Sequence, residues 1–185
     1  LAWEAFERVG GHGVSPQLLA SVANTVGVAL GATVVTLAAG LVLGWSMRLA
    51  QGRRRPAGAL LALRSGSLGY AVPGTVLAIG LLLPLAWFDG AANAVLGGFG
   101  MTPRMLLMGS ATALVLAYAA RFLAIAAGGV EAGLARVPPS LDQAAASLGH
   151  APGATLCRIH LPLLQAALAA AALLVFVDAM KELPA

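Results

Sequence analysis

Charged residues are scarce in this chain, and that scarcity excludes most soluble folds. Asp, Glu, Lys and Arg together make up 10% of its 185 residues, whereas hydrophobic residues make up 59%. Soluble domains carry roughly 25% charged residues. The mean hydropathy is correspondingly high, at +0.89. The composition therefore indicates a protein that lies in a lipid bilayer.

Cysteine is nearly absent, and the histidines are scattered. The single cysteine, Cys157, excludes a disulfide framework and a cysteine metal cluster. His12, His150 and His160 have no ligand spacing with carboxylates or cysteines, and neither a phosphate-binding lysine motif nor a Ser-His-Asp arrangement occurs. We therefore expect no catalytic residue, no metal site and no bound cofactor, with His150 and His160 at the membrane surface.

Long apolar runs are what the chain has instead. Each is long enough to cross about 30 Å of hydrocarbon as a helix, so we expect an all-α membrane protein. Residues 1–18 are expected to form a lead-in outside the bilayer. The expected spans cover about residues 19–47, 68–88, 105–127 and 162–180.

Glycine pairs in the first expected span favour close helix packing. Gly27 with Gly31, and Gly40 with Gly44, form GxxxG pairs that allow another helix to approach. The chain has 23 glycines, however, so either pair could arise from composition alone.

The third expected span carries one charge. Arg121 lies near its expected inner end, where it either extends to the membrane interface or pairs with a partner subunit. Gly128-Gly129 are expected to end this span.

Basic residues are concentrated in a loop that predicts the orientation of the chain. This loop, 48–66, is expected on the cytoplasmic side by the positive-inside rule. Alternation of the spans places the loop 130–162 on the same side, and seven of the eleven basic residues fall in these two loops. A nucleic-acid patch is the rival interpretation of the cluster, but its place between two apolar runs favours a role in topology, and no nucleic acid is expected as a partner. The basic residues of the first loop are Arg48, Arg53, Arg54, Arg55 and Arg64.

The loop 130–162 is expected to contain a short docking helix. Pro138-Pro139 end the preceding helix, and Ser140 with Gln143 is typical of a capping box. Gly149 suits a left-handed helix end. A small apolar face of this kind suits a groove on another protein. That face consists of Leu141, Ala144, Ala145 and Leu148.

The same segment resembles a known signature. Gln143-Ala144-Ala145 is followed after three residues by Gly149, then after nine residues by Ile159, and then by Leu161-Pro162. This spacing resembles the EAA motif of ABC-importer permeases, with Gln143 in place of Glu, which removes a charge. An alanine-rich helical hairpin with a chance match is the alternative.

The resemblance implies a family and a set of partners. It implies that residues 19–185 form a partial type I ABC transmembrane domain, with 130–162 as the coupling loop and a missing fifth span after Ala185. The implied partners are cytoplasmic ABC ATPase subunits that bind the ATP, an external substrate-binding protein, and a second permease core, as a homodimer or a fused half. The implied location is the bacterial inner membrane, with several passes through it.

Two further segments resemble the ferric-iron branch of that family, GYAVPGTVLAIGLL and VFVDAMKELPA. Thiamine, polyamine and sulfate permeases remain alternatives for the substrate class. The first of these segments contains Tyr70 and Pro73-Gly74, which either line a translocation path or form a packing kink.

The second segment ends in a charged cluster of Asp178, Lys181 and Glu182. This cluster either lines the mouth of the path or marks the outer interface. An ion-coupled secondary transporter would need ionisable residues at mid-membrane and inverted repeats, and the expected spans show neither. A purely structural membrane subunit would not need the polar docking loop.

Overall fold

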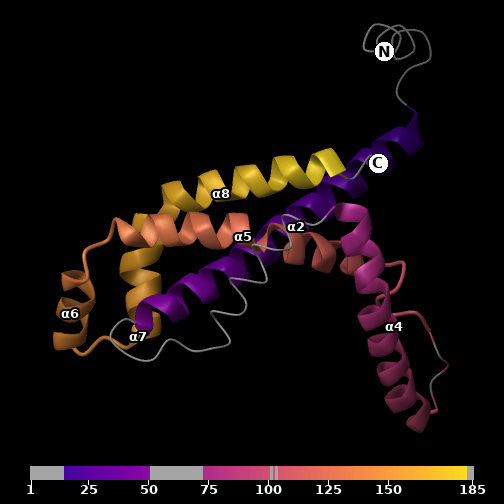
Figure 1. The fold of residues 1–185 in the computed structure, drawn as a ribbon, viewed down its shortest axis with the longest axis horizontal. Coiled ribbons are helices and arrows are strands. Elements are labelled where there is room, and N and C mark those ends of the chain that lie inside the picture. Colours follow the sequence, from indigo (N-terminus) through magenta and orange to yellow (C-terminus); the bar gives the residue numbers. More distant parts are fainter. Residues whose placement is uncertain (1–14, 51–72, 101, 103, 183–185) are drawn as a thin grey trace, which may run out of the picture.

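The computed structural model describes residues 15–50, 73–100, 102 and 104–182, and all regular structure in these ranges is helical. Four stretches of it have the length and hydropathy of membrane spans. The described part of the chain is therefore all-α, as predicted, with four helical stretches compatible with membrane spans (Figure 1). The elements are α2 (Pro16–Leu49), α4 (Gly74–Gly98), α5 (Ala111–Ala135), α6 (Ser140–Ser147), α7 (Pro152–Thr155), the π-helical turn η1 (Leu156–His160) and α8 (Leu161–Glu182).

Helices α2, α5 and α8 pack against one another as a bundle (Figure 1). α2 begins at Pro16, where Ser15 accepts a hydrogen bond from the amide of Leu18 and so caps the helix. The core of the bundle consists of two clusters, one near each end. One contains Ala29, Phe122, Val175 and Ala179, and the other contains Trp45, Val130, Leu134 and Leu164.

Small residues allow α2 and α5 to approach closely. A β-carbon at Gly40 would lie 3.0 Å from the backbone of Ala126, and one at Gly44 would lie 2.6 Å from the side chain of Val130. The predicted role of this glycine pair in helix packing is therefore confirmed. A β-carbon at Gly27, by contrast, would have nothing within 4 Å.

The expected end of the third span is wrong. Gly128-Gly129 lie inside α5, which continues to Ala135. A β-carbon at Gly129 would lie 2.8 Å from that of Ala171, and one at Gly133 would lie 2.6 Å from the side chain of Leu164. These glycines serve close packing against α8 and do not stop the helix.

α4 also differs from the expected second span. Pro73 is its N-cap, so Pro73-Gly74 begins the described helix and does not kink it; the proline inside α4 is Pro84. α4 continues to Gly98 through residues that were expected to form a loop, and Asp89 accepts hydrogen bonds from two amides of the segment that follows. The helix diverges from the bundle (Figure 1). Tyr70 and the rest of 51–72 lie outside the described residues.

α7, η1 and α8 form one continuous helical stretch, Pro152–Glu182. Pro152 opens it at the first helical position, where its missing N–H costs no hydrogen bond. Pro162 does not open the span, because it lies one residue inside α8. A proline has no N–H to donate and its ring crowds the carbonyl four residues earlier. The wider π-helical turn directly before α8 accommodates that ring.

Candidate functional site

The short helix α6 lies beyond the end of the bundle, between α5 and α7 (Figure 1). It ends as predicted, because Gly149 has a φ of 78°, in the left-handed region. Gln143, Ala144 and Ser147 are exposed, and Leu148 is 77% exposed. We call these four residues the α6 outer face.

Two details of the predicted docking helix are wrong. The N-cap is Pro139, and no side chain caps this end, so Ser140 and Gln143 do not form a capping box. Ala145 is only 2% exposed and Leu141 is half-buried. A short helix must bury one stripe against its own chain, so the predicted apolar face is divided: Ala145 packs inward and Leu148 points outward.

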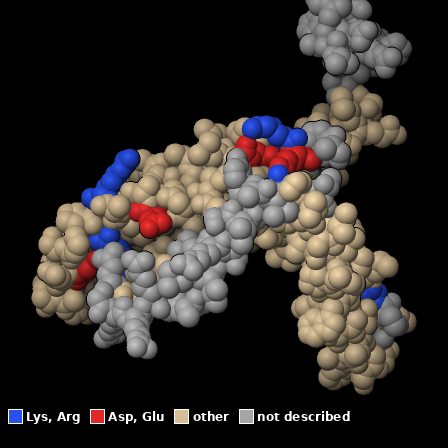
Figure 2. Space-filling view, in the orientation of Figure 1, with Lys and Arg blue, Asp and Glu red and all other residues tan. Residues whose placement is uncertain are grey.

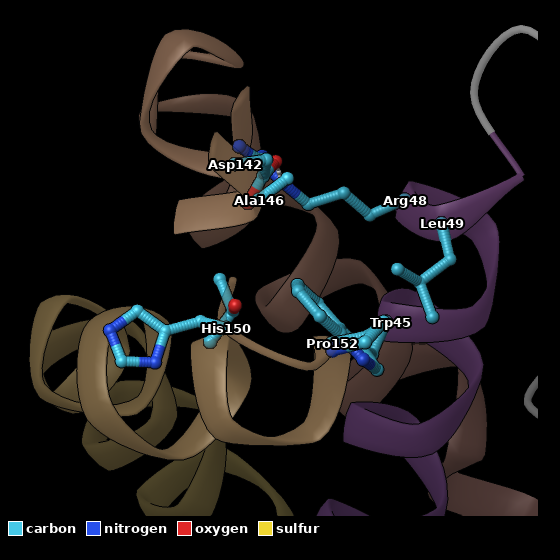
Figure 3. A pocket seen from close by; sticks show the side chains of 8 residues that line it. Trp45, Arg48, Leu49, Asp142, Ala146, His150 and Pro152 are labelled. Carbon is cyan, nitrogen blue, oxygen red and sulfur yellow. Dashed lines mark hydrogen bonds and ion pairs between the residues drawn. The ribbon is translucent and has the colours of Figure 1, made fainter. Parts of the chain in front are cut away.

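A charged cluster that the sequence did not reveal holds α6 in place. Arg48 Nε donates to Asp142 Oδ2 at 2.8 Å, and His160 Nε2 lies 2.5 Å from Asp142 Oδ1. We call these three residues the Asp142 clamp. Figure 3 shows Arg48 reaching from α2 toward Asp142. The clamp joins α2, α6 and η1, which are far apart in the sequence.

Arg48 also binds the end of α5. Its Nη1 donates to the carbonyl of Leu134 at 2.6 Å, and its Nη2 donates to that of Val137 at 2.9 Å. The last carbonyls of a helix have no partner within the helix, and the dipole there favours a cation. Arg48 was predicted only as one of several topology residues. Its side chain is 6% exposed, so it is a buried structural residue.

His160 lies inside the molecule, a burial that the sequence did not predict. It is fully buried, and its ring centroid lies 4.8 Å from that of Trp45. Burial alone would raise the pKa of Asp142. The hydrogen bonds from His160 and Arg48 outweigh that effect and hold the pKa of Asp142 below its ordinary value of 3.8. The carboxylate of Asp142 is therefore charged at neutral pH.

A shallow cavity of about 220 Å³ lies beside the clamp (Figure 3). It is lined by Trp45, Arg48, Asp142, His150 and Pro152, among others. His150 is exposed.

A larger cavity, of about 560 Å³, lies where α4 begins and α8 ends. It brings together residues that the sequence placed on the candidate path, since Pro73 and Gly74 line it together with Lys181 and Glu182. Asp178 lines an adjoining cavity. Figure 2 shows acidic and basic side chains gathered near this end of α8 on a largely uncharged surface.

Two ion pairs border the larger cavity. Lys181 Nζ lies 2.8 Å from Asp178 Oδ1, which is three residues earlier on the same helix face. Glu182, however, pairs with Arg121 of α5 at 2.7 Å. Arg121 was not predicted as a path residue, and its carboxylate partner belongs to this chain.

The position of Arg121 along α5 differs from the position expected from the sequence. Arg121 lies ten residues after Ala111, the first residue of α5, and so about 15 Å along the helix at 1.5 Å per residue. The third span was placed too early in the sequence, which put Arg121 near a helix end. One ionisable group, Arg121, therefore lies well inside α5, whereas its partner Glu182 is the last residue of α8.

No protein-family model, curated protein or solved structure matches this chain. Within the described ranges, no group of three or more His, Cys, Asp or Glu side chains is placed to hold a metal ion.

Proposed function

We propose that this chain is a transmembrane permease subunit of an ATP-driven ABC importer of type I. The observation that carries the proposal is α6. It is a short helix outside the bundle, it ends at a left-handed Gly149, and it precedes Ile159 and Leu161-Pro162 at the spacing of the EAA motif. Its outer face is uncharged and exposed, which suits a protein groove.

The position of α6 supports a coupling role. It lies where α5 ends and α7 begins, and the clamp ties it to the last turn of α2. A partner that binds the α6 outer face can therefore act on the ends of three spanning helices. In this proposal the partner is a cytoplasmic ATPase subunit that holds the ATP, and loop 130–162 faces the cytoplasm of a bacterial cell. A second permease core and an external binding protein complete the transporter.

The larger cavity is the proposed part of the translocation path. A hard cation such as ferric iron prefers carboxylate oxygens, and Asp178 and Glu182 offer them from one helix. Both carboxylates are held in ion pairs, so the Arg121–Glu182 and Asp178–Lys181 pairs would open as substrate passes. Permeases for thiamine, polyamine or sulfate remain alternatives within the same proposal.

One observation favours a second candidate function. A charged residue well inside a spanning helix is typical of ion-coupled transporters, and Arg121 lies ten residues into α5, where it pairs with Glu182 at the end of α8. The two functions differ in their energy source: the importer needs a bound ATPase, whereas the secondary transporter needs only an ion gradient.

Co-purification of the full chain with an ATPase subunit separates the two functions. Gly149→Trp should abolish ATPase binding and transport while leaving membrane insertion intact, because it distorts the left-handed end of α6. Gly153→Trp is the matched control, since neither glycine has an atom within 4 Å of its added β-carbon and only Gly149 has a positive φ. Retained transport and ATPase binding in Gly149→Trp would contradict the proposal.

A further inference from the structure

We infer that Asp142 is a positioning residue whose carboxylate fixes α6 to the bundle, so that α6 and the ends of α2, α5 and α8 move as one unit. The role in coupling rests on the proposed function, whereas the fixing of α6 does not.

Both oxygens of Asp142 are used. Oδ2 accepts from Arg48 Nε at 2.8 Å and Oδ1 from His160 Nε2 at 2.5 Å. Hydrogen bonds to an ionised group are shorter and stronger than those between neutral groups. The two bonds span 94 and 18 residues of sequence, so one carboxylate connects three separate elements.

The guanidinium of Arg48 extends the connection to a fourth element. While Nε binds Asp142, Nη1 and Nη2 bind the carbonyls of Leu134 and Val137 at the end of α5. A planar guanidinium can make these bonds together because its donors lie in a fixed fork. A lysine ammonium has no such geometry.

Apolar packing contributes little to the position of α6. The helix has eight residues, of which Ala145 is buried and Leu141 is the one large apolar side chain that is half-buried. A helix this short is not stable on its own, and one methyl group with one half-buried leucine gives it little apolar packing. The clamp partners are far better buried, with the Arg48 side chain 6% exposed and that of His160 fully buried. The charged network therefore sets the position of α6.

The clamp also determines which face of α6 is presented. Asp142 and Ala145 are three residues apart and share the inward face. Gln143, Ala144 and Ser147 lie on the other side of the helix and are exposed. Loss of the clamp would leave the residues of the α6 outer face unchanged, but α6 could then rotate relative to the bundle.

The test is a distance between two spin labels in the full chain in lipid nanodiscs. One label is placed at Ser147→Cys on α6 and the other at Val34→Cys, an exposed position on α2. Cys157→Ser removes the native thiol, which is exposed. We expect a single narrow distance that becomes a broad distribution in Asp142→Asn. Glu131→Gln, which neutralises an exposed carboxylate of α5, is the matched control and should keep the narrow distance.

A distance in Asp142→Asn as narrow as in the control would overturn the inference. If Asp142→Asn fails to insert into the membrane, the same distance is measured in Arg48→Lys. This variant keeps the positive charge but lacks the planar guanidinium donors, so a narrow distance in it would also overturn the inference.

The coupling role has its own measurement, the ATP hydrolysed per substrate transported. This ratio should rise in Asp142→Asn while the ATPase stays bound, which a merely structural residue would not cause. An unchanged ratio with a broadened distance would remove the coupling role alone. A chain that binds no ATPase would refute the proposed function and leave the distance result standing.

Discussion

Arg48 illustrates how much one residue can determine in a chain with so few charges. It closes α2, caps the end of α5 through two carbonyls, and binds Asp142 of α6. In the sequence it is one of five arginines of a basic loop. Its burial follows from the path of α5 and α6 around it, which no local pattern in the sequence encodes.

The first prediction concerns the pH dependence of the Asp142 clamp. Because the folded-state pKa of Asp142 lies below its ordinary value of 3.8, its stabilising effect is present above 3.8 and is lost as the pH falls through the lowered pKa. Thermal unfolding in detergent should show a higher midpoint for the unchanged chain than for Asp142→Asn at neutral pH. This difference should shrink below pH 3.8. A difference that stays constant through the acid range would contradict the assignment.

The second prediction concerns the ion pair at the larger cavity. Glu182→Gln leaves Arg121, whose side chain is 15% exposed, without its carboxylate partner. The side chain of Glu182 is 31% exposed, so we expect the loss of stability to be smaller than the about 3 kcal/mol of a fully buried pair. We expect lost uptake with preserved binding-protein-stimulated ATP hydrolysis, measured at matched expression, and the same direction for Asp178→Asn. Unchanged uptake in both variants, equal to that of the Glu131→Gln control, would show that the cluster only anchors the end of α8.

At the scale of elements, the structural role of a glycine depends on the helices around it. Gly149 ends a helix, as predicted, while Gly128-Gly129 lie inside one. The difference is that Gly149 follows a short helix outside the bundle, where a left-handed turn is free to form. Gly129 faces α8 at a distance that only a residue without a side chain permits. The sequence alone does not say which helix will approach.

Local periodicity or spacing predicted three features of the molecule. These are the long apolar helices, the short helix in loop 130–162 and the Asp178–Lys181 pair. The Asp142 clamp and the Arg121–Glu182 pair could not be predicted, because each joins groups more than fifteen residues apart. The segment Gly90–Gly98 looked like a loop because of its glycines, yet it continues α4.

The third prediction compares two glycines of α2. Gly40→Ala places a methyl group 3.0 Å from the backbone of Ala126, which cannot move without shifting α5. Overpacking of this kind costs about 1–3 kcal/mol. Gly27→Ala meets nothing within 4 Å and should change stability by less than about 0.5 kcal/mol. The midpoint of thermal unfolding should therefore fall for Gly40→Ala alone. Equal effects of the two variants would mean that α2 and α5 do not pack as described.

At the scale of the whole molecule, the last turn of α2 and the loop 130–162 lie at the same end of the bundle. Contact between Arg48 and Asp142 requires this, and it agrees with the orientation inferred from the basic residues. Arg53, Arg54 and Arg55, which were predicted to set that orientation, lie outside the described residues. α4 diverges from the bundle and presents apolar side chains such as Leu83, which is 80% exposed.

The central claim is that an ATPase subunit docks on the α6 outer face, and site-specific photo-cross-linking at Leu148 tests it most directly. Leu148 is replaced by benzoylphenylalanine in cells that express the full chain, and cross-linked products are identified by mass spectrometry. Leu83 is the matched control, because it is an equally exposed leucine on a spanning helix. We predict a cross-link to an ATP-hydrolysing subunit from position 148 and none from position 83. An inserted, transport-active protein that gives no such product at position 148, or gives it equally at position 83, would contradict the claim.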